Sequence, residues 1–564
     1  MSEGDPVTAL AAASHGFGRS AAQRKLRLLR QIAEARQLDA EQLRVLGDAL
    51  SFMRAYPDDR AVRAAVDDAA ASMRARVAEL ERQQDLEAVA DSGLPGATHV
   101  YSFHYGVVAE LVEEFPGCLA IDWESLEDES SLVDALRLSL PAAEVDGLED
   151  ERLSLEQWFE VIGAGTGKTD LEILIERLRR SGHAEPVQVK LFDAGDVPVR
   201  YHLTRVGTGR CEIELDTARI HYQRQAIRRE RFPIAGEILR PLDPPKPCTV
   251  ADGRRLIRLA LAALCSRNLA IYPLIYANPA DVTRVRCGRG IEVLLVGIRP
   301  GFRAPLETIT FYLIAKNGVP VAYGPAGVFL GACEMGINLF PEFRGAEIWY
   351  VYSQLMRVLR HVLGVEYFYL LRYGMGEGNP DAIRSGAFWF YRKLGFRPDN
   401  PRVEALARQE EARIAAEPGY RSSPAMLRRL SHTEVSFDLS GGRARPFDFG
   451  ALGVAQSRFV GERFGGDRER AERACSRRVA KLLGATARAR WRAPEQASFC
   501  SMAPLLAMID DLPAWSRRDR TALLRAVRAR GKVPQATAAR AFAAHPRFGL
   551  ALRQLCADVA AQLP

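Results

Sequence analysis

The fold is decided by the stretch Leu339-Phe340-Pro341-Glu342-Phe343-Arg344-Gly345. The residues before it, 321–340, are rich in Val, Tyr, Phe and Ile and are interrupted by glycines, which predicts one or two bent strands. Pro341 has no backbone N–H, so the strand should end there. After Gly345, apolar residues recur at helical spacing as far as Gly364. The stretch therefore predicts a strand, a tight loop and a helix in direct succession.

A second strand and a second helix follow. Residues 365–373 are mostly aliphatic and aromatic, which is typical of a central strand. Asn379 and Pro380 suit the N-cap and the first position of a helix, and Gly395 should end it. This second predicted helix carries the pattern Ala387-x-x-x-Tyr391-x-Lys393-x-Gly395-Phe396.

Two motifs, Leu339-x-Pro341-x-x-Arg344-Gly345 and the Ala387–Phe396 pattern, occur here in a set order with a strand and helices around them. Together they resemble the core of the GNAT superfamily, the coenzyme-A-dependent N-acyltransferases. The resemblance covers roughly residues 247–398. It implies an α+β chain whose centre is a GNAT-like mixed sheet with flanking helices. It also implies transfer of an acyl group from an acyl-CoA, such as acetyl-CoA, to an unknown amine of a small molecule or protein.

The resemblance implies two catalytic residues. Tyr391 matches a tyrosine that protonates the leaving thiolate in many family members, although its aromatic neighbours equally suit a packing role. A glutamate on the strand before the loop is often the base, and Glu334 is the candidate in this place. Side chains alternate along a strand, so Glu334 should share a face with Asn338 and point away from Cys333. Without a bulge, this orientation can turn Glu334 away from the site.

The loop implies a pyrophosphate site at a helix N-terminus, where backbone N–H groups face the phosphates. Its residues would be Leu339, Arg344, Gly345, Ala346 and Ile348. Two later family glycines are replaced by Glu347 and Trp349. A carboxylate there opposes phosphate binding unless it turns away, yet it is also what the helix dipole favours. The alternative is therefore a catalytically inactive GNAT fold that acts as a binding or scaffold protein.

The 564 residues suit several domains. We expect a helical region at 1–92, a mixed α/β region of unknown type at 93–240, the GNAT-like domain at 247–440 and a basic helical domain at 441–564. Within the second region, helices are predicted at 107–114, 153–161 and 170–180. Residues 186–192, 197–203 and 211–215 predict a small antiparallel sheet.

The sequence Gly163-Ala164-Gly165-Thr166-Gly167-Lys168-Thr169 resembles a phosphate-binding P-loop in part. That motif needs a glycine at position 162, which is Ile162, and a preceding strand, where residues 154–160 predict a helix. We expect instead a Gly-rich turn between two helices, with Thr169 or Asp170 as the N-cap.

The net charge of +7 is unevenly placed, because residues 441–564 carry 23 Lys+Arg against 10 Asp+Glu. A basic region of this kind suits RNA, and some GNAT-like folds use aminoacyl-tRNA as the donor. Arginines on ordinary solvated helix faces are the simpler interpretation.

The cysteines, the histidines and the apolar runs of the sequence bear on metal binding and on the cellular compartment. The nine cysteines lack a C-x-x-C pair and the nine histidines lack an H-x-x-x-H pair, so no metal site is predicted. Scattered thiols of this kind suit a reducing compartment. Neither a signal peptide nor an apolar run of about 20 residues is seen, so we expect a cytoplasmic protein without a membrane partner.

Overall fold

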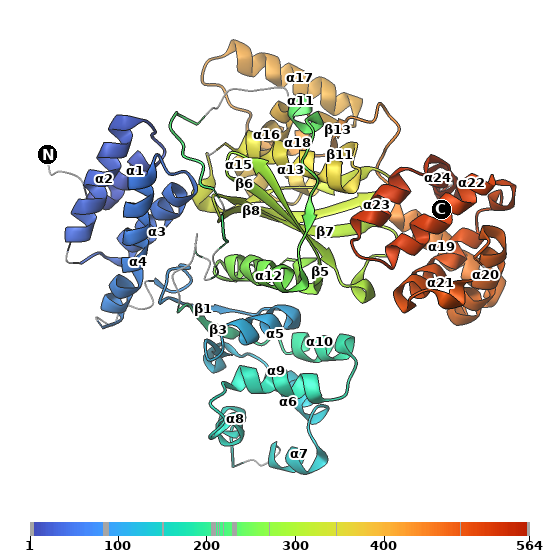
Figure 1. Cartoon of the computed structure of the whole chain (residues 1–564), viewed down its shortest axis with the longest axis horizontal. Coiled ribbons are helices and arrows are strands. Elements are labelled where there is room, and N and C mark those ends of the chain that lie inside the picture. The colour runs from blue at the N-terminus through green and yellow to red at the C-terminus, as the bar shows by residue number, and fades with distance from the viewer. Residues whose placement is uncertain are drawn as a thin grey trace.

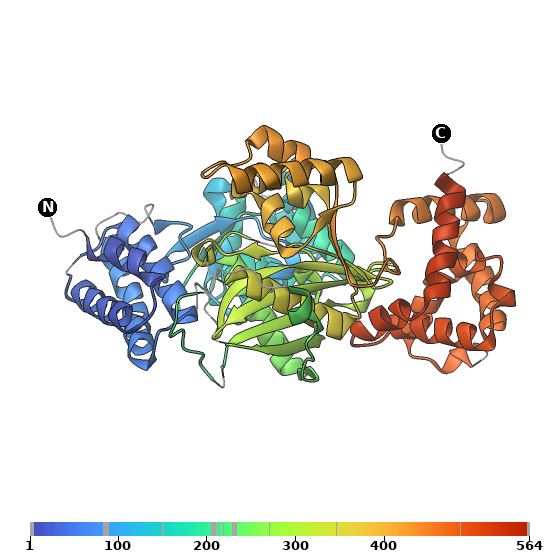
Figure 2. The same cartoon turned by 90° about the horizontal axis from the view of Figure 1, so that it is seen from above.

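The computed structural model describes residues 5–35, 37–82, 89–148, 152–204, 210, 213, 215–217, 219–227, 234–269, 271–345, 347–485 and 487–560. The chain belongs to the α+β class, as predicted. A mixed sheet lies between a group of N-terminal helices and a group of C-terminal helices, with a smaller α/β region beside it (Figure 1). The turned view shows the two helical groups at opposite ends of the molecule (Figure 2).

The N-terminal region folds as four helices around an apolar core of their own: α1 (Pro6–Ser14), α2 (Arg19–Glu34), α3 (Ala40–Ala55) and α4 (Arg60–Arg82). α3 begins with a capping box, in which the Gln42 backbone N–H donates to Asp39 at 2.8 Å and the Asp39 N–H donates to Gln42 at 3.0 Å. Lys25 of α2 and Asp58, between α3 and α4, form a buried ion pair at 2.6 Å. The helical prediction for this region is confirmed.

The second region holds a three-stranded antiparallel sheet in the order β1-β3-β2, with helices around it. Its elements are β1 (Thr98–Tyr101), α5 (Tyr105–Glu114), β2 (Leu119–Ile121), α6 (Glu129–Arg137), α7 (Ala142–Leu148), α8 (Leu155–Gly163), α9 (Asp170–Arg180), α10 (Glu185–Ala194) and β3 (Val199–His202). The helices predicted at 107–114, 153–161 and 170–180 and the strand at 197–203 are confirmed.

The strand predicted at 186–192 is wrong, because these residues lie in α10. The alternation of Val187, Val189 and Leu191 suggested a strand. Pro186 instead occupies the first turn of a helix, where its missing N–H has no intrahelical partner to lose. Much of the predicted strand at 211–215 lies outside the described residues.

The central sheet runs in the order β12-β13-β11-β9-β8-β7-β6-β5-β4, with β10 paired to β8. Its described strands are β4 (Lys246–Pro247), β5 (Ala277–Gly288), β6 (Ile291–Ile298), β7 (Thr308–Lys316), β8 (Val319–Phe329), β9 (Ala332–Met335), β10 (Asn338–Leu339), β11 (Tyr367–Leu370), β12 (Arg397–Pro398) and β13 (Val435–Asp438). Strands β5 to β9 are antiparallel, and β9 and β11 are parallel. The predicted hairpin turn is confirmed, since Asn317 and Gly318 both have positive φ angles, 49° and 83°.

Helices cover both faces of this sheet. α12 (Val250–Cys265) lies on one face, and α13 (Ile348–Leu363) and α16 (Ala387–Leu394) lie on the other (Figure 1). The second predicted helix is divided by Gly386 into α15 (Pro380–Ser385) and α16. Asn379 caps α15 as predicted, because its side chain accepts from the Ala382 N–H at 3.1 Å. The other helices here are α11 (Ile234–Leu239), α14 (Arg372–Met375), α17 (Pro401–Ala416) and α18 (Pro424–Leu430).

The C-terminal region is helical, as predicted, and has its own apolar core. It comprises α19 (Phe449–Phe464), α20 (Arg468–Leu483), α21 (Ala493–Ala507), α22 (Arg517–Arg530), α23 (Ala536–Ala543) and α24 (Pro546–Ala560). The ring of Phe329, at the end of β8, packs against Phe447, Phe449 and Phe542 and joins this region to the sheet. Among the described residues, no helix combines the length and the apolar character needed to cross a membrane.

Candidate functional site

The parallel strands β9 and β11 pair over three residues and then part. The register joins Ala332 to Tyr367 and Glu334 to Tyr369. Beyond this point the chain stays with β8, because Asn338 and Leu339 of β10 pair with Tyr323 and Ala322. The register against β8 is the same for β9 and β10, so no residue is inserted between them. The alternation of side chains predicted for residues 332–339 therefore holds.

Buried tyrosines surround the place where β9 and β11 part, on the face of the sheet that α13 and α16 cover. The Tyr312 hydroxyl donates to the Gly336 carbonyl. It reaches this carbonyl across Gly324, where a Cβ would lie 2.4 Å from the Tyr312 hydroxyl oxygen. Tyr391 is only 6% exposed, and its ring lies 5.7 Å from that of Tyr352. Burial raises the pKa of Tyr391, and the nearby backbone of Ile337 and the Tyr352 hydroxyl oppose this rise.

An acidic cluster, defined here as Glu307, Glu334, Tyr369 and Glu434, occupies the opposite face. Glu334 and Tyr369 are neighbours in the β9–β11 register. Glu307 precedes β7 and lies over Gly327 of β8, since a Cβ on Gly327 would be 2.3 Å from Glu307 Oε1. Gly327 is itself paired with Glu334. The missing side chain at Gly327 thus leaves room for the carboxylate of Glu307 to approach that of Glu334.

The charges of this cluster are not compensated. Burial and the Glu334 carboxylate raise the pKa of Glu307 from 4.5 to about 7. Burial and Glu434 raise the pKa of Glu334, and burial together with the three carboxylates raises that of Tyr369. No hydrogen bond or ion pair joins the carboxylate of Glu307 or Glu334 to another residue within the described part of the chain. Both glutamates are partly exposed, so a ligand can supply the missing positive charge.

The two predicted catalytic residues lie on opposite faces of the sheet. Tyr391 belongs to the core that contains Cys333, whereas Glu334 follows Cys333 and points the other way. Glu307, Tyr369 and Glu434 were missed from the sequence, because they come from three separate segments that only the sheet register brings together.

The predicted pyrophosphate loop is open to solvent at its centre. Arg344 and Gly345 are exposed, and no atom lies within 4 Å of a Cβ built on Gly345, whose φ is 85°. Leu339 is half-buried in β10, and Ile348 is the first residue of α13. Ala346 lies outside the described residues.

Glu347, the N-cap of α13, points into the protein and away from this opening. Its side chain is 3% exposed, accepts a hydrogen bond from Lys316 Nζ at 2.6 Å and forms an ion pair with Arg289 Nη2 at 2.7 Å. Lys316 is fully buried and lies 4.8 Å from the Tyr56 ring of the N-terminal region. The two cations neutralise the carboxylate that the sequence places against the phosphates. This carboxylate is therefore engaged in the interior, and Arg344 and Gly345 stay open to solvent.

The space between α13 and α16 is lined by aromatic rings. Trp349, in the first turn of α13, packs on Phe390 of α16 with ring centroids 5.5 Å apart. Phe390 also contacts Tyr352 at 5.9 Å and Tyr391 at 5.0 Å. The Trp349 side chain is thus turned onto α16 rather than into the loop.

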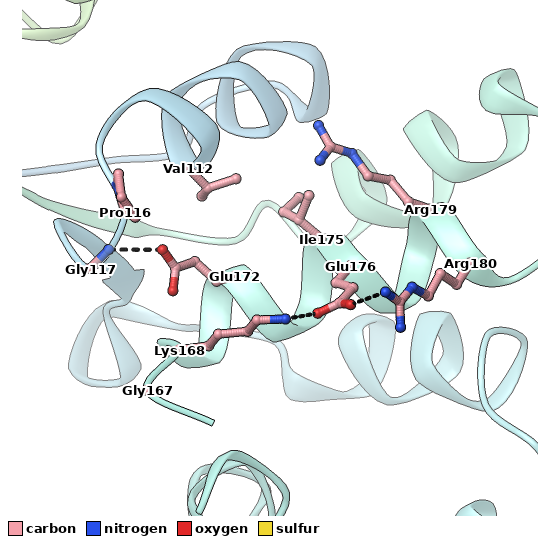
Figure 3. A pocket seen from close by; sticks show the side chains of 10 residues that line it. All are labelled: Val112, Pro116, Gly117, Gly167, Lys168, Glu172, Ile175, Glu176, Arg179 and Arg180. Carbon is pink, nitrogen blue, oxygen red and sulfur yellow. Dashed lines mark hydrogen bonds and ion pairs between the residues drawn. The ribbon is translucent and has the colours of Figure 1, made fainter. Parts of the chain in front are cut away.

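The Gly-rich sequence 163–169 forms a turn between α8 and α9, as predicted. Thr169 caps α9 through a capping box with Glu172. The turn borders a pocket of about 570 Å³, in which Glu176 binds both Lys168 and Arg180, and Glu172 accepts from the Gly117 N–H at 2.8 Å (Figure 3). Because these charged groups satisfy one another, the pocket offers no free charge to a phosphate.

The C-terminal region carries a basic stripe on α20, formed by Arg470, Arg473, Arg477 and Lys481, all exposed. At helical spacing these residues lie opposite the buried positions Ala471, Cys475 and Val479. Arg473 pairs with Glu469 at 3.1 Å. No group of His, Cys, Asp and Glu suited to hold a metal ion occurs within the described part of the chain.

Searches of protein-family models, curated proteins and solved structures found no match to this chain.

Proposed function

We propose that the central domain is an N-acyltransferase that acts on an amine bound at the acidic cluster. The observation that carries this proposal is the placement of Glu307 against Glu334 over Gly327. A carboxyl group with a pKa near 7 can take a proton at neutral pH and release it again, which suits a general base. The predicted base Glu334 then assists by raising the pKa of Glu307 and by attracting a positively charged amine.

The residues of this chain would divide the chemistry between the two faces of the sheet. Glu307 takes a proton from the amine, so that its nitrogen can attack the acyl carbonyl carbon. A C–N bond forms, and the bond from the carbonyl carbon to sulfur breaks. Tyr391 carries its proton at neutral pH, burial raises its pKa further, and it is the acid for the departing thiolate.

Coenzyme A, when bound, would supply the acyl group as a thioester. Arg344 would hold its phosphates through a charge-assisted contact, and the open backbone at Gly345 would allow their close approach. Leu339 and Ile348 flank this loop. The free thiols of the eight described cysteines agree with a cytoplasmic location, which is part of the proposal.

A second candidate function is binding of a cationic amine without chemistry. The specific observation in its favour is the burial of Tyr391, which is 6% exposed and packed among Tyr352, Phe390 and Phe396. A thiolate could not reach this hydroxyl without movement of the rings. In this case the acidic cluster alone would be functional.

One experiment separates the two candidates. The full chain is mixed with acetyl-CoA and a set of diamines, polyamines and lysine peptides, and both thiol release and amine binding are measured. Thiol release that falls at least a hundredfold in Glu307→Gln, but not in the exposed control Glu472→Gln, supports acyl transfer. Amine binding that Glu307→Gln weakens, without thiol release, supports the binding protein. An absence of both activities overturns the assignment of the acidic cluster.

A further inference from the structure

A basic pocket lies at a different place on the central domain, beside the turn between β5 and β6. Its volume is about 510 Å³, which is within the range of small-molecule sites. One wall is formed by residues 217, 219–222 and 224, and the other by residues 286 and 288–292. The side chains that line it include four arginines and one carboxylate, namely Arg219, Arg224, Arg286, Arg289 and Glu292.

The wall that contains residues 219–224 is fixed in place by contacts of residues 216, 221 and 223 to three parts of the protein. Arg284 donates to the Asp216 carbonyl at 2.6 Å. Asn317, in the β7–β8 turn, accepts from the His221 N–H at 2.8 Å and donates to the His221 carbonyl at 2.9 Å. The Gln223 N–H donates to the Pro57 carbonyl of the N-terminal region at 2.7 Å. The arginines of this wall are therefore carried by an anchored segment.

The positive charge of the pocket exceeds what its acidic group can neutralise. Glu292 is buried and occupied, because it accepts from Arg284 Nε at 2.9 Å and from Arg286 Nε at 3.1 Å. Arg289 shares Glu347 with the buried Lys316. Neither Arg219 nor Arg224 has an ion pair with a described residue, and both are exposed.

We propose that this pocket binds the phosphate group of a small molecule. Two guanidinium groups on one wall, neither of them ion-paired within the described residues, match the two negative charges of a phosphate monoester or a diphosphate, and they can donate paired hydrogen bonds to its oxygens. The half-buried Tyr222 and Ile220 add apolar surface for the remainder of the ligand. This distribution distinguishes the pocket from the one beside α9, where the charged groups are already paired.

The pocket is connected to the loop before α13. Arg289 lines the pocket and also binds Glu347, the N-cap of α13, while its guanidinium lies 4.5 Å from the Tyr350 ring. A phosphate that bound Arg289 would compete with Glu347 for this arginine. Binding should therefore change the exchange of backbone amides in the first turn of α13 as well as in the pocket walls.

The test uses the full chain and inorganic pyrophosphate as the probe, with calorimetric titration at low salt. We expect the double variant Arg219→Gln, Arg224→Gln to weaken binding at least tenfold. The matched variant Arg470→Gln, Arg477→Gln removes the same charge from α20 and should change the affinity less than twofold. Hydrogen exchange with pyrophosphate should show protection of residues 219–227 and 286–292.

Absence of pyrophosphate binding by the natural chain would overturn the proposal. Equal weakening in the α20 variant would also overturn it, because binding would then depend on net charge and not on this pocket. Protection confined to residues 344–350 would assign the phosphate to the loop of the proposed acyltransferase instead. These outcomes are independent of whether thiol release is observed.

Discussion

Because the pKa of Glu307 is raised, Glu307→Gln should stabilise the folded protein measurably at alkaline pH. Below about pH 4.5 the carboxyl is protonated in both the folded and the unfolded chain, so glutamine changes little. Between 4.5 and 7 the unfolded chain releases its proton and the folded protein keeps it. The free energy of unfolding therefore falls as the pH rises through this interval.

The size of the effect follows from the two pKa values. An interval from 4.5 to about 7, at about 1.36 kcal/mol for each pH unit, corresponds to roughly 3 kcal/mol. This figure is an upper value, because Glu307 is partly exposed and solvent screens its charge. We expect Glu307→Gln to be more stable than the natural protein by about 2–3 kcal/mol at pH 8, and by almost nothing at pH 4.5.

Hydrogen exchange of amides in β7 and β8 is the suitable assay, since it reports the opening free energy of the sheet itself. The natural protein and the variant are compared at each pH, which cancels the intrinsic pH dependence of exchange. Glu334→Gln provides a control, because removing that carboxylate should lower the pKa of Glu307 and reduce the effect by less than half, since burial is the larger cause of the shift. A stability difference that does not vary with pH would refute the reasoning about this cluster.

Four further predictions concern other parts of the site. Gly327→Ala should push the Glu307 carboxylate aside, because the new Cβ would lie 2.3 Å from Glu307 Oε1. The pKa of the general base, read from the pH–rate profile of thiol release, should then fall. An unchanged profile would contradict the proposed placement of Glu307. Lys316→Met should lower the opening free energy of β7, measured by hydrogen exchange, by about 3–5 kcal/mol, since it leaves buried Glu347 with one cation. Arg286→Met is the control: the Arg286 side chain is 65% exposed, and its loss should cost less than about 1 kcal/mol. Tyr391→Phe should reduce thiol release at least tenfold and change stability by no more than about 1 kcal/mol; full activity would remove Tyr391 from the mechanism. Neutralising the basic stripe of α20 should abolish salt-dependent RNA binding in filter assays if the C-terminal region binds RNA, and absence of binding by the natural chain at low salt would end that hypothesis.

The sequence predicted those turns and helix ends that particular residue types mark. Asn317-Gly318 marked the hairpin, Asn379-Pro380 marked the start of α15, and Gly364 marked the end of α13. The 12-residue strand β5 was missed. Its arginines resemble those of a solvated loop, and only the neighbouring strand provides Glu292 to pair with Arg284 and Arg286.

The acidic cluster could not have been found from local patterns. Glu334 was predicted from its position before the loop, but Glu307 and Glu434 lie in the connections that directly precede β7 and β13. Gly327 was the available signal, because a glycine within an apolar strand often marks a close approach by another group. Identifying the group that approaches requires the pairing of β8 with both β7 and β9.

In the sequence, Glu347 suggests that phosphate binding at the loop is unfavourable, but the folded structure holds its carboxylate away from the loop. Beside a phosphate loop, a carboxylate predicts repulsion. In the protein, Lys316 from β7 and Arg289 from the β5–β6 turn hold this carboxylate in the interior, and Tyr56 of the N-terminal region covers Lys316. The state of the loop therefore depends on residues far from it in the chain. The sequence of the N-terminal helices does not reveal this role. Tyr56 covers the buried ion pair of Lys316 with Glu347, and that ion pair holds the Glu347 carboxylate away from the opening at Gly345.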